Sequence, residues 1–150
     1  MEDNGQLQMQ VGDVVKMPDG LYRVLVMTAN SGIFIQMETT RLNILRFSMD
    51  FIKYQVSICG IQKADWKDEE LLVKDLTDEE KEELNRKAVA IERMLQSLYP
   101  EWERIQSKET KPEIKDLMQE LGRSKAVTHR KIRNYLQSGR NPYSLADGRK

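Results

Sequence analysis

The sequence holds one cysteine and one histidine among its 150 residues. Cys59 has no second thiol to pair with, which excludes an internal disulfide bond and a zinc site built from thiolates. It lies in an apolar segment, so we expect a small, buried hydrophobic side chain there. His129 has no second imidazole for a metal site and no serine or cysteine nucleophile to partner it. The sequence therefore predicts no enzyme activity, no cofactor and no metal site in this chain.

Long hydrophobic runs are also missing. No run approaches the roughly 20 apolar residues that span a bilayer, so we expect no membrane association. The first four residues, MEDN, are acidic and lack the apolar core of a secretory signal. A chain of this length suffices for one domain or two small ones. We expect a cytoplasmic, monomeric protein.

Net charge is absent as well, because 24 Lys and Arg residues balance 24 Asp and Glu residues. The charges are nevertheless distributed unevenly along the sequence. From Leu121 onward eight cations face one acid, Asp147, for a net charge of +7, and the rest of the chain must then carry −7. A concentrated cationic end is typical of proteins that bind nucleic acid. Its cations are Arg123, Lys125, Arg130, Lys131, Arg133, Arg140, Arg149 and Lys150.

The first third of the chain has the pattern of a β-meander. Period-2 apolar runs at Val11–Lys16, Leu21–Met27 and Ile33–Glu38 predict three strands, separated by turn signals at Pro18–Gly20 and Ala29–Gly32. The expected product is a small antiparallel sheet, either curled or closed into a barrel.

The continuation of this sheet is ambiguous. Arg41–Phe47 could form another strand, and Ser48 could cap a short helix that leads into a strand around Val56. The β-rich segment either supports the helical part of the chain or adds a second phosphate-binding surface. The cations available for such a surface are Lys16, Arg23, Arg41 and Arg46.

The middle of the chain, from Asp65 to Glu103, is dense in acids. Their spacing does not follow a calcium-binding loop, and many stand where linkers and first helical turns favour carboxylates, so we reject a metal site. Thr77 and Glu80 form a capping box that predicts a helix, and Pro100 closes it. Its apolar stripe consists of Leu84, Ala88, Ile91, Leu95 and Leu98. We expect Trp102 and Ile105 to continue the packing surface in a short turn, and Trp66 to dock the linker onto one domain or the other.

Two further helices come almost without a gap. Thr110 and Glu113 form a second capping box, with Pro112 in the first turn. Gly122 ends that helix and Ser124 caps the next one. So short a connection makes the helices cross steeply, and with the Thr77 helix they form the minimal scaffold of a helix-turn-helix. The apolar positions of the first of these two helices are Ile114, Leu117, Met118 and Leu121.

The last helix is expected to have two faces. At about 100° per residue, Thr128, Ile132 and Tyr135 share a packed arc, flanked by Val127 and Leu136. The opposite arc is suited to the major groove of DNA, because it has cationic side chains, a small residue and a free helix N-terminus. That arc carries Ala126, His129, Arg130, Arg133 and Gln137.

Seven residues are therefore assigned to DNA. Lys125, His129, Arg130 and Arg133 are assigned to base edges or nearby phosphates. Arg123 and Ser124 anchor the N-terminal end of the helix, and Arg140 anchors its exit. The alternative is a structural helical pair whose basic face is merely solvated.

The predicted fold class is α+β, a small antiparallel sheet or barrel followed by a three-helix helix-turn-helix domain. We expect a β-rich subdomain over residues 1–62, an acidic linker over 63–76, a helical DNA-binding domain over 77–145 and a tail over 146–150.

The stretch SKAVTHRKIRNYLQSGRNPYSL, residues 124–145, resembles the N-terminal DNA-binding region of TnsB-like transposases. In that family a helix rich in Arg and Tyr leads to a Gly, a short Asn/Thr-Pro segment and a Leu. The β-rich start is similar too, through VGDVV at 11–15 and YRVL at 22–25. The order of these motifs, with an acidic helical middle, covers nearly the whole chain.

The resemblance implies binding to double-stranded DNA at transposon ends, in the bacterial cytoplasm at the nucleoid, with other transposition proteins as further partners. It also implies that a DDE domain of the retroviral-integrase type, using divalent metal, lies beyond Lys150, and that this chain is a fragment that binds DNA without cutting it. None of the acidic residues above occupies the region of that family's catalytic acids. Two other functions stay open: a stand-alone helix-turn-helix regulator, and a protein-interaction adaptor that does not bind DNA.

Overall fold

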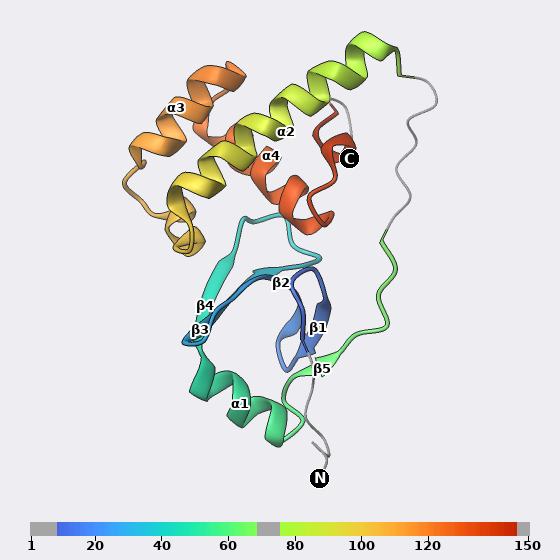
Figure 1. Cartoon of the computed structure of the whole chain (residues 1–150), viewed down its shortest axis with the longest axis vertical. Coiled ribbons are helices and arrows are strands. Elements are labelled where there is room, and N and C mark those ends of the chain that lie inside the picture. The colour runs from blue at the N-terminus through green and yellow to red at the C-terminus, as the bar shows by residue number, and fades with distance from the viewer. Residues whose placement is uncertain (1–8, 69–75, 147–150) are drawn as a thin grey trace. The chain divides into compact units, whose positions relative to one another are not determined.

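A computed structural model describes residues 9–68 and 76–146 (Figure 1). The chain divides into two compact units. Among the described residues, unit 1 holds 9–39 and 43–67, and unit 2 holds 40–42, 68 and 76–146. One antiparallel sheet and four α-helices make up the fold of these residues, which confirms the α+β class. The acids Glu69, Glu70 and Asp75 of the predicted linker, and the tail residues Asp147, Arg149 and Lys150, lie outside the described residues.

Unit 1 is built on a five-stranded sheet with the order β4-β3-β2-β1-β5 (Figure 1). The three predicted strands are confirmed as β1 (Val14–Met17), β2 (Gly20–Met27) and β3 (Ser31–Gln36). The proposed fourth strand is β4 (Ile44–Ser48). The last strand, β5 (Gln62–Lys63), pairs antiparallel with β1, with Val15 opposite Lys63. Its two exposed polar residues give no strand pattern, and the sequence did not predict it.

Helix α1 (Met49–Ser57) covers the sheet with Ile52 and Val56. The Oγ of Ser48 accepts from the N–H of Phe51 at 3.1 Å, as the predicted cap requires. Gly32 permits the close packing, because a Cβ there would lie 2.8 Å from the Cδ1 of Ile52. The core that the helix completes consists of Val15, Met17, Tyr22, Val24, Phe34, Ile52, Val56 and Ile61.

One alternative and one prediction for this segment are wrong. Val56 belongs to α1 and not to a strand, because burial of one face of the helix overrides the strand preference of a β-branched residue. Cys59 is exposed and not buried. It comes after the end of α1 with a φ of 61°, in the left-handed region, and the chain returns to the core at Ile61.

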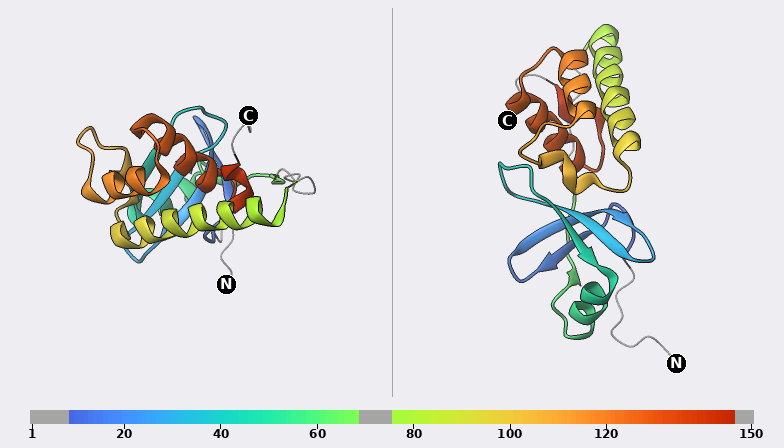
Figure 2. Two further views of the ribbon diagram at one scale, coloured as in Figure 1. Left: turned by 90° about the horizontal axis from the view of Figure 1, so that it is seen from above. Right: turned by 90° about the vertical axis from the view of Figure 1, so that its left-hand side faces the viewer.

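Unit 2 is helical: α2 (Asp78–Leu98), the 3₁₀ helix η1 (Trp102–Gln106), α3 (Pro112–Leu121), α4 (Lys125–Gln137) and the 3₁₀ helix η2 (Pro142–Leu145). α2 packs beside α3 (Figure 2), and η2 contacts both α2 and α4. None of the described helices is both long and apolar enough to cross a membrane. The largest fully buried side chains of this unit are Ile91, Leu95, Ile105, Ile114 and Ile132.

The predicted start of α2 is confirmed in detail. The N–H of Glu80 donates to the Oγ1 of Thr77 at 3.1 Å, and the Thr77 N–H donates to the Oε1 of Glu80 at 2.8 Å. Four positions of the apolar stripe are buried and Leu98 is partly exposed. Trp102 and Ile105 are buried as expected, and the Nε1 of Trp102 donates to the carbonyl of Leu95 at 2.8 Å.

The second predicted capping box is wrong. The N-cap of α3 is Lys111, and no side chain caps this helix end. Pro112 is the first helical residue, because its fixed φ suits that position and its missing N–H needs no partner. Thr110 therefore stands one residue too early to cap. At the other end Gly122 has a φ of 64° and a ψ of 40°, the left-handed conformation predicted for it.

Candidate nucleic-acid interface

The residues Gly122, Arg123 and Ser124 alone join α3 to α4. Gly122 reverses the chain, and its N–H donates to the carbonyl of Gln119 at 3.2 Å. The Oγ of Ser124 then accepts from the N–H of Val127 at 3.3 Å, so that α4 begins at once. This connection fixes the first turn of α4 on the surface, where Ser124 and Arg123 are both exposed.

The predicted division of α4 into two faces is confirmed. Thr128, Ile132, Tyr135 and Leu136 are buried. On the other side Ala126 and Arg130 are exposed, while His129, Arg133 and Gln137 are partly exposed. No acid occurs within α4, so every charged side chain on its exposed surface is a cation. A face of this kind can donate to phosphate oxygens and to the acceptor atoms of guanine.

Lys125 and His129 lie along one edge of this face. The Nζ of Lys125 donates to the carbonyl of Lys108 at 3.2 Å. Burial lowers the pKa of His129, and the charge of Lys125 lowers it further. The imidazole is therefore neutral near pH 7, and its Nε2 is buried with no hydrogen-bond partner among the residues described. A neutral imidazole can accept as well as donate a hydrogen bond.

Arg133 is held by polar groups of its own unit. Its Nη1 donates to the carbonyl of Thr40, and its Nη2 donates to the Oδ1 of Asn134 at 2.9 Å. Burial, and then the neighbouring Arg130, lower the pKa of Arg133, although an arginine remains a cation. Neither contact is an ion pair, so the positive charge stays available to a phosphate or a base. Arg130 is the more exposed of the two.

Arg140 is engaged with an acid of α2, although the sequence assigns it to DNA. Its Nε lies 2.7 Å from the Oε2 of Glu92, and its Nη2 contacts the other carboxylate oxygen. Its guanidinium also lies 5.5 Å from the ring centre of Trp102. The hydroxyl of Tyr135 donates to the same Oε2 at 2.6 Å. Arg140 therefore has a structural role, because it connects the segment after α4 to α2.

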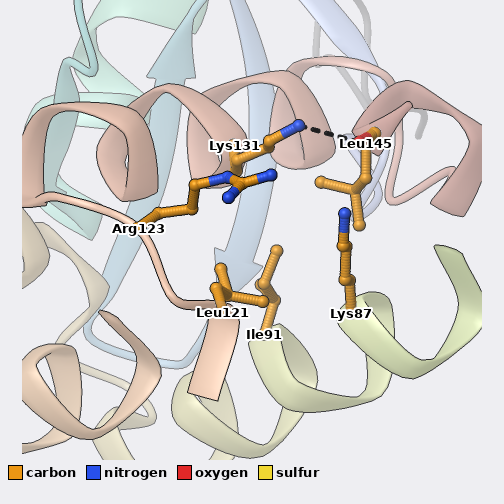
Figure 3. Close-up of a pocket in the computed structure, with 6 residues that line it drawn as sticks. All are labelled: Lys87, Ile91, Leu121, Arg123, Lys131 and Leu145. Atoms are coloured by element: carbon orange, nitrogen blue, oxygen red, sulfur yellow. Dashed lines mark hydrogen bonds between the residues drawn. The ribbon is translucent and has the colours of Figure 1, made fainter. Parts of the chain in front are cut away.

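Lys131 has a structural role that the sequence alone does not predict. Only 6% of it is exposed, and its Nζ donates to the carbonyl of Leu145 at 2.9 Å. The helical spacing indicates this burial, because Lys131 lies three residues after Thr128 and four before Tyr135, on the packed arc. Figure 3 shows its ammonium beside Arg123 and Lys87 at a small pocket. The lining residues of the pocket are Lys87, Ile91, Leu121, Arg123, Lys131 and Leu145.

The cations of unit 1 have different surroundings. Arg23 is buried in the sheet with 4% exposure, and its Nη1 donates to the carbonyl of Gly12 at 2.6 Å. It therefore supports the fold and cannot reach a phosphate. The Nη1 of Arg46 donates to the Oγ of Ser31 at 2.9 Å from an exposed position. Lys16 and Arg41 are exposed.

The described residues contain no group of three or more His, Cys, Asp or Glu side chains placed to hold a metal ion. The sequence matches no protein-family model, and no curated protein matches it.

Proposed function

We propose that unit 2 binds double-stranded DNA as a helix-turn-helix, with the exposed face of α4 in the major groove. The observation that carries the proposal is the three-residue turn through Gly122, which presents an acid-free helix with its cationic side outward. Arg130 is the leading candidate for a base contact, because it is exposed at the middle of that face. Ser124 and Arg123 stand where a helix N-terminus meets phosphate.

The biological setting we propose is a TnsB-like transposase, with transposon-end DNA as the ligand. The resemblance of residues 124–145 to that family supports the setting, together with the order of a β-rich unit, an acidic α2 and the basic α4. Arg140, which lies just beyond α4 in the resembling stretch, packs within unit 2 through Glu92. The chain is then a DNA-binding part of an enzyme whose cutting and joining chemistry resides elsewhere.

The decisive experiment is selection of bound sequences from a random duplex pool. We expect an enriched site without palindromic symmetry, bound by a single copy. A palindromic site bound by a dimer would favour a stand-alone regulator instead. Failure to bind any duplex would leave only the protein-interaction adaptor.

A variant pair tests the assigned face. Arg130→Ala is expected to weaken the selected site by about 1 to 3 kcal/mol while leaving random duplex nearly unchanged, as the loss of a base contact does. Arg86→Ala is the control, because Arg86 pairs with Glu83 on α2. Equal weakening of selected and random DNA by Arg130→Ala would make it a phosphate contact. We expect Arg133→Ala to give the same pattern as Arg130→Ala.

A further inference from the structure

The segment between η1 and α3, residues 107–111, lies beside the first turn of α4. The Nζ of Lys125 donates to the carbonyl of Lys108 at 3.2 Å, although the two residues are 17 positions apart in the sequence. A further hydrogen bond fixes the segment itself, because the Oγ of Ser107 donates to the carbonyl of Glu109 at 2.7 Å. The lysines of this segment, Lys108 and Lys111, therefore adjoin the amino end of α4, and both precede the cationic end of the sequence that begins at Leu121.

The charges of these lysines are not neutralised by ion pairs. Lys108 is exposed and Lys111 is partly exposed. The ammonium groups of Lys108, Lys111 and Lys125 form no ion pair with any residue that the structure describes. Arginines elsewhere in unit 2 do pair with acids: Arg86 with Glu83, Arg93 with Glu120, and Arg104 with Glu101. The positive charge beside the amino end of α4 therefore stays available to an anion from outside the chain.

The position of the segment indicates which anion it meets. Lys125 is partly exposed and lies outside the packed arc of α4, on the same side as His129 and Arg133, about one and two turns later. An α-helix with its side chains is about 10 to 12 Å across and the major groove is about 12 Å wide, so the phosphate backbones run along both sides of an inserted helix. A segment at the edge of the inserted face therefore stands opposite one of these backbones.

We propose that residues 107–111 bind a phosphate backbone of the DNA through Lys108 and Lys111, on the side of α4 where Lys125 lies. The inference rests on the proposed function and extends the DNA contact to a segment that precedes both helices of the motif. The carboxylate of Glu109, between the two lysines in the sequence, opposes this contact because it repels phosphate.

The test is the salt dependence of binding to a short random duplex, measured by fluorescence anisotropy on the full chain. Each phosphate contact contributes about 0.9 to the slope of log affinity against log salt. Lys108→Gln and Lys111→Gln are each expected to make the slope shallower by about 1. Lys108→Gln keeps the carbonyl that accepts from Lys125, so the segment retains its place beside α4. Lys108→Arg retains the charge and should keep the wild-type slope.

Lys81→Gln is the matched control. It removes the same charge near the amino end of α2, whereas η1 and the segment follow the carboxyl end of that helix. Its slope should equal that of the wild type. Urea unfolding of each variant identifies conditions under which all of them are folded.

Glu109→Gln tests the same contact with the opposite sign. Removal of the repelling carboxylate is expected to raise the affinity for random duplex by about twofold at low salt. Glu82→Gln, at an exposed acid of α2, is the control and should leave the affinity at the wild-type value. Equal affinities of Glu109→Gln and Glu82→Gln would contradict a backbone contact at residues 107–111.

The outcomes separate the two proposals. If the wild type binds no duplex, the proposed function fails and this inference fails with it. If the wild type binds duplex and the slopes of Lys108→Gln and Lys111→Gln both equal that of Lys81→Gln, only the contact through residues 107–111 is overturned. A phosphate contact also predicts that these two variants weaken selected and random duplex equally, because phosphates carry no sequence information. Weakening of the selected site alone would show base contacts and overturn the backbone assignment.

Discussion

The guanidinium of Arg140 is paired side-on with the carboxylate of Glu92, with 2.7 Å between Nε and Oε2. The pair joins residues 48 positions apart in the sequence and fastens the end of α4 to α2. Because Tyr135 donates to the same carboxylate, Glu92 organises two residues of the C-terminal half of unit 2. The orientation of α4 depends on this acid as well as on the apolar core.

Arg140→Gln is expected to lower the free energy of unfolding by about 1 to 2 kcal/mol. The loss stays below the roughly 3 to 5 kcal/mol of a fully buried pair, because the side chains remain 38% and 35% exposed. Urea unfolding measures it. Arg86→Gln, which breaks an exposed surface pair with Glu83, should lower the free energy of unfolding less than Arg140→Gln does. Under conditions in which both proteins are folded, the DNA affinity of Arg140→Gln should equal that of the wild type. A large loss of affinity would instead indicate that Arg140 contacts DNA.

The same pair makes stability depend on pH. Burial raises the pKa of Glu92, but hydrogen bonds from Arg140 and Tyr135 outweigh burial and hold this pKa below its ordinary value of 4.5. A depressed carboxyl pKa stabilises the fold above the unfolded value, and the stabilisation disappears as the pH falls through the folded value. The difference in unfolding free energy between the wild type and Glu92→Gln should therefore shrink on going from about pH 6 to about pH 3. A difference that is constant over this range would contradict the assignment.

Gly122→Ala tests the turn between α3 and α4. A Cβ at this position would meet nothing within 4 Å, so the cost is the left-handed backbone alone. We expect a loss of about 1 to 2 kcal/mol in unfolding free energy, measured by urea unfolding. Gly122→Asn should lose less, because asparagine tolerates this conformation better. Equal stability of Gly122→Ala and the wild type would mean that the turn relaxes without the left-handed residue.

Two threonines provide a matched test of helix capping. Thr77→Ala removes the capping box of α2 and should cost about 1 kcal/mol. Thr110→Ala should leave stability within about 0.5 kcal/mol of the wild type, because Lys111 and not Thr110 precedes the first helical residue of α3. Thermal or urea unfolding of the two variants checks both. A loss at Thr110 equal to that at Thr77 would contradict the observed start of α3.

Local rules explain which parts of the fold could be predicted. The caps at Ser48, Thr77 and Ser124 and the terminator Gly122 act over three or four residues, so their sequence signals are complete in themselves. The cap predicted at Thr110 is wrong because a proline two residues later fixes the helix start more strongly than a possible side-chain cap. The strand β5 gives no local signal, since pairing with β1 alone makes it a strand.

The candidate site was predictable to the extent that one helix determines it. Periodicity places the faces of α4 correctly, from Ala126 on the outside to Ile132 on the inside. Periodicity within one helix does not predict contacts between residues that are distant in the sequence. The pairing of Arg140 with Glu92, and the meeting of Lys87 with Arg123 and Lys131, depend on how α2 packs against the rest of unit 2.

The pairing of β1 with β5 brings the two ends of the sheet together. Val15 stands opposite Lys63, and the N–H of Ala64 donates to the carbonyl of Val14 at 3.0 Å. The chain therefore enters the sheet and leaves it at neighbouring positions. Domains whose two ends lie close together tolerate insertion into a loop of another protein. In unit 1 taken by itself, a circular permutation with a short peptide bridging residues 64 and 14, and with new ends at Asp19, would interrupt the sheet only at the hairpin between β1 and β2.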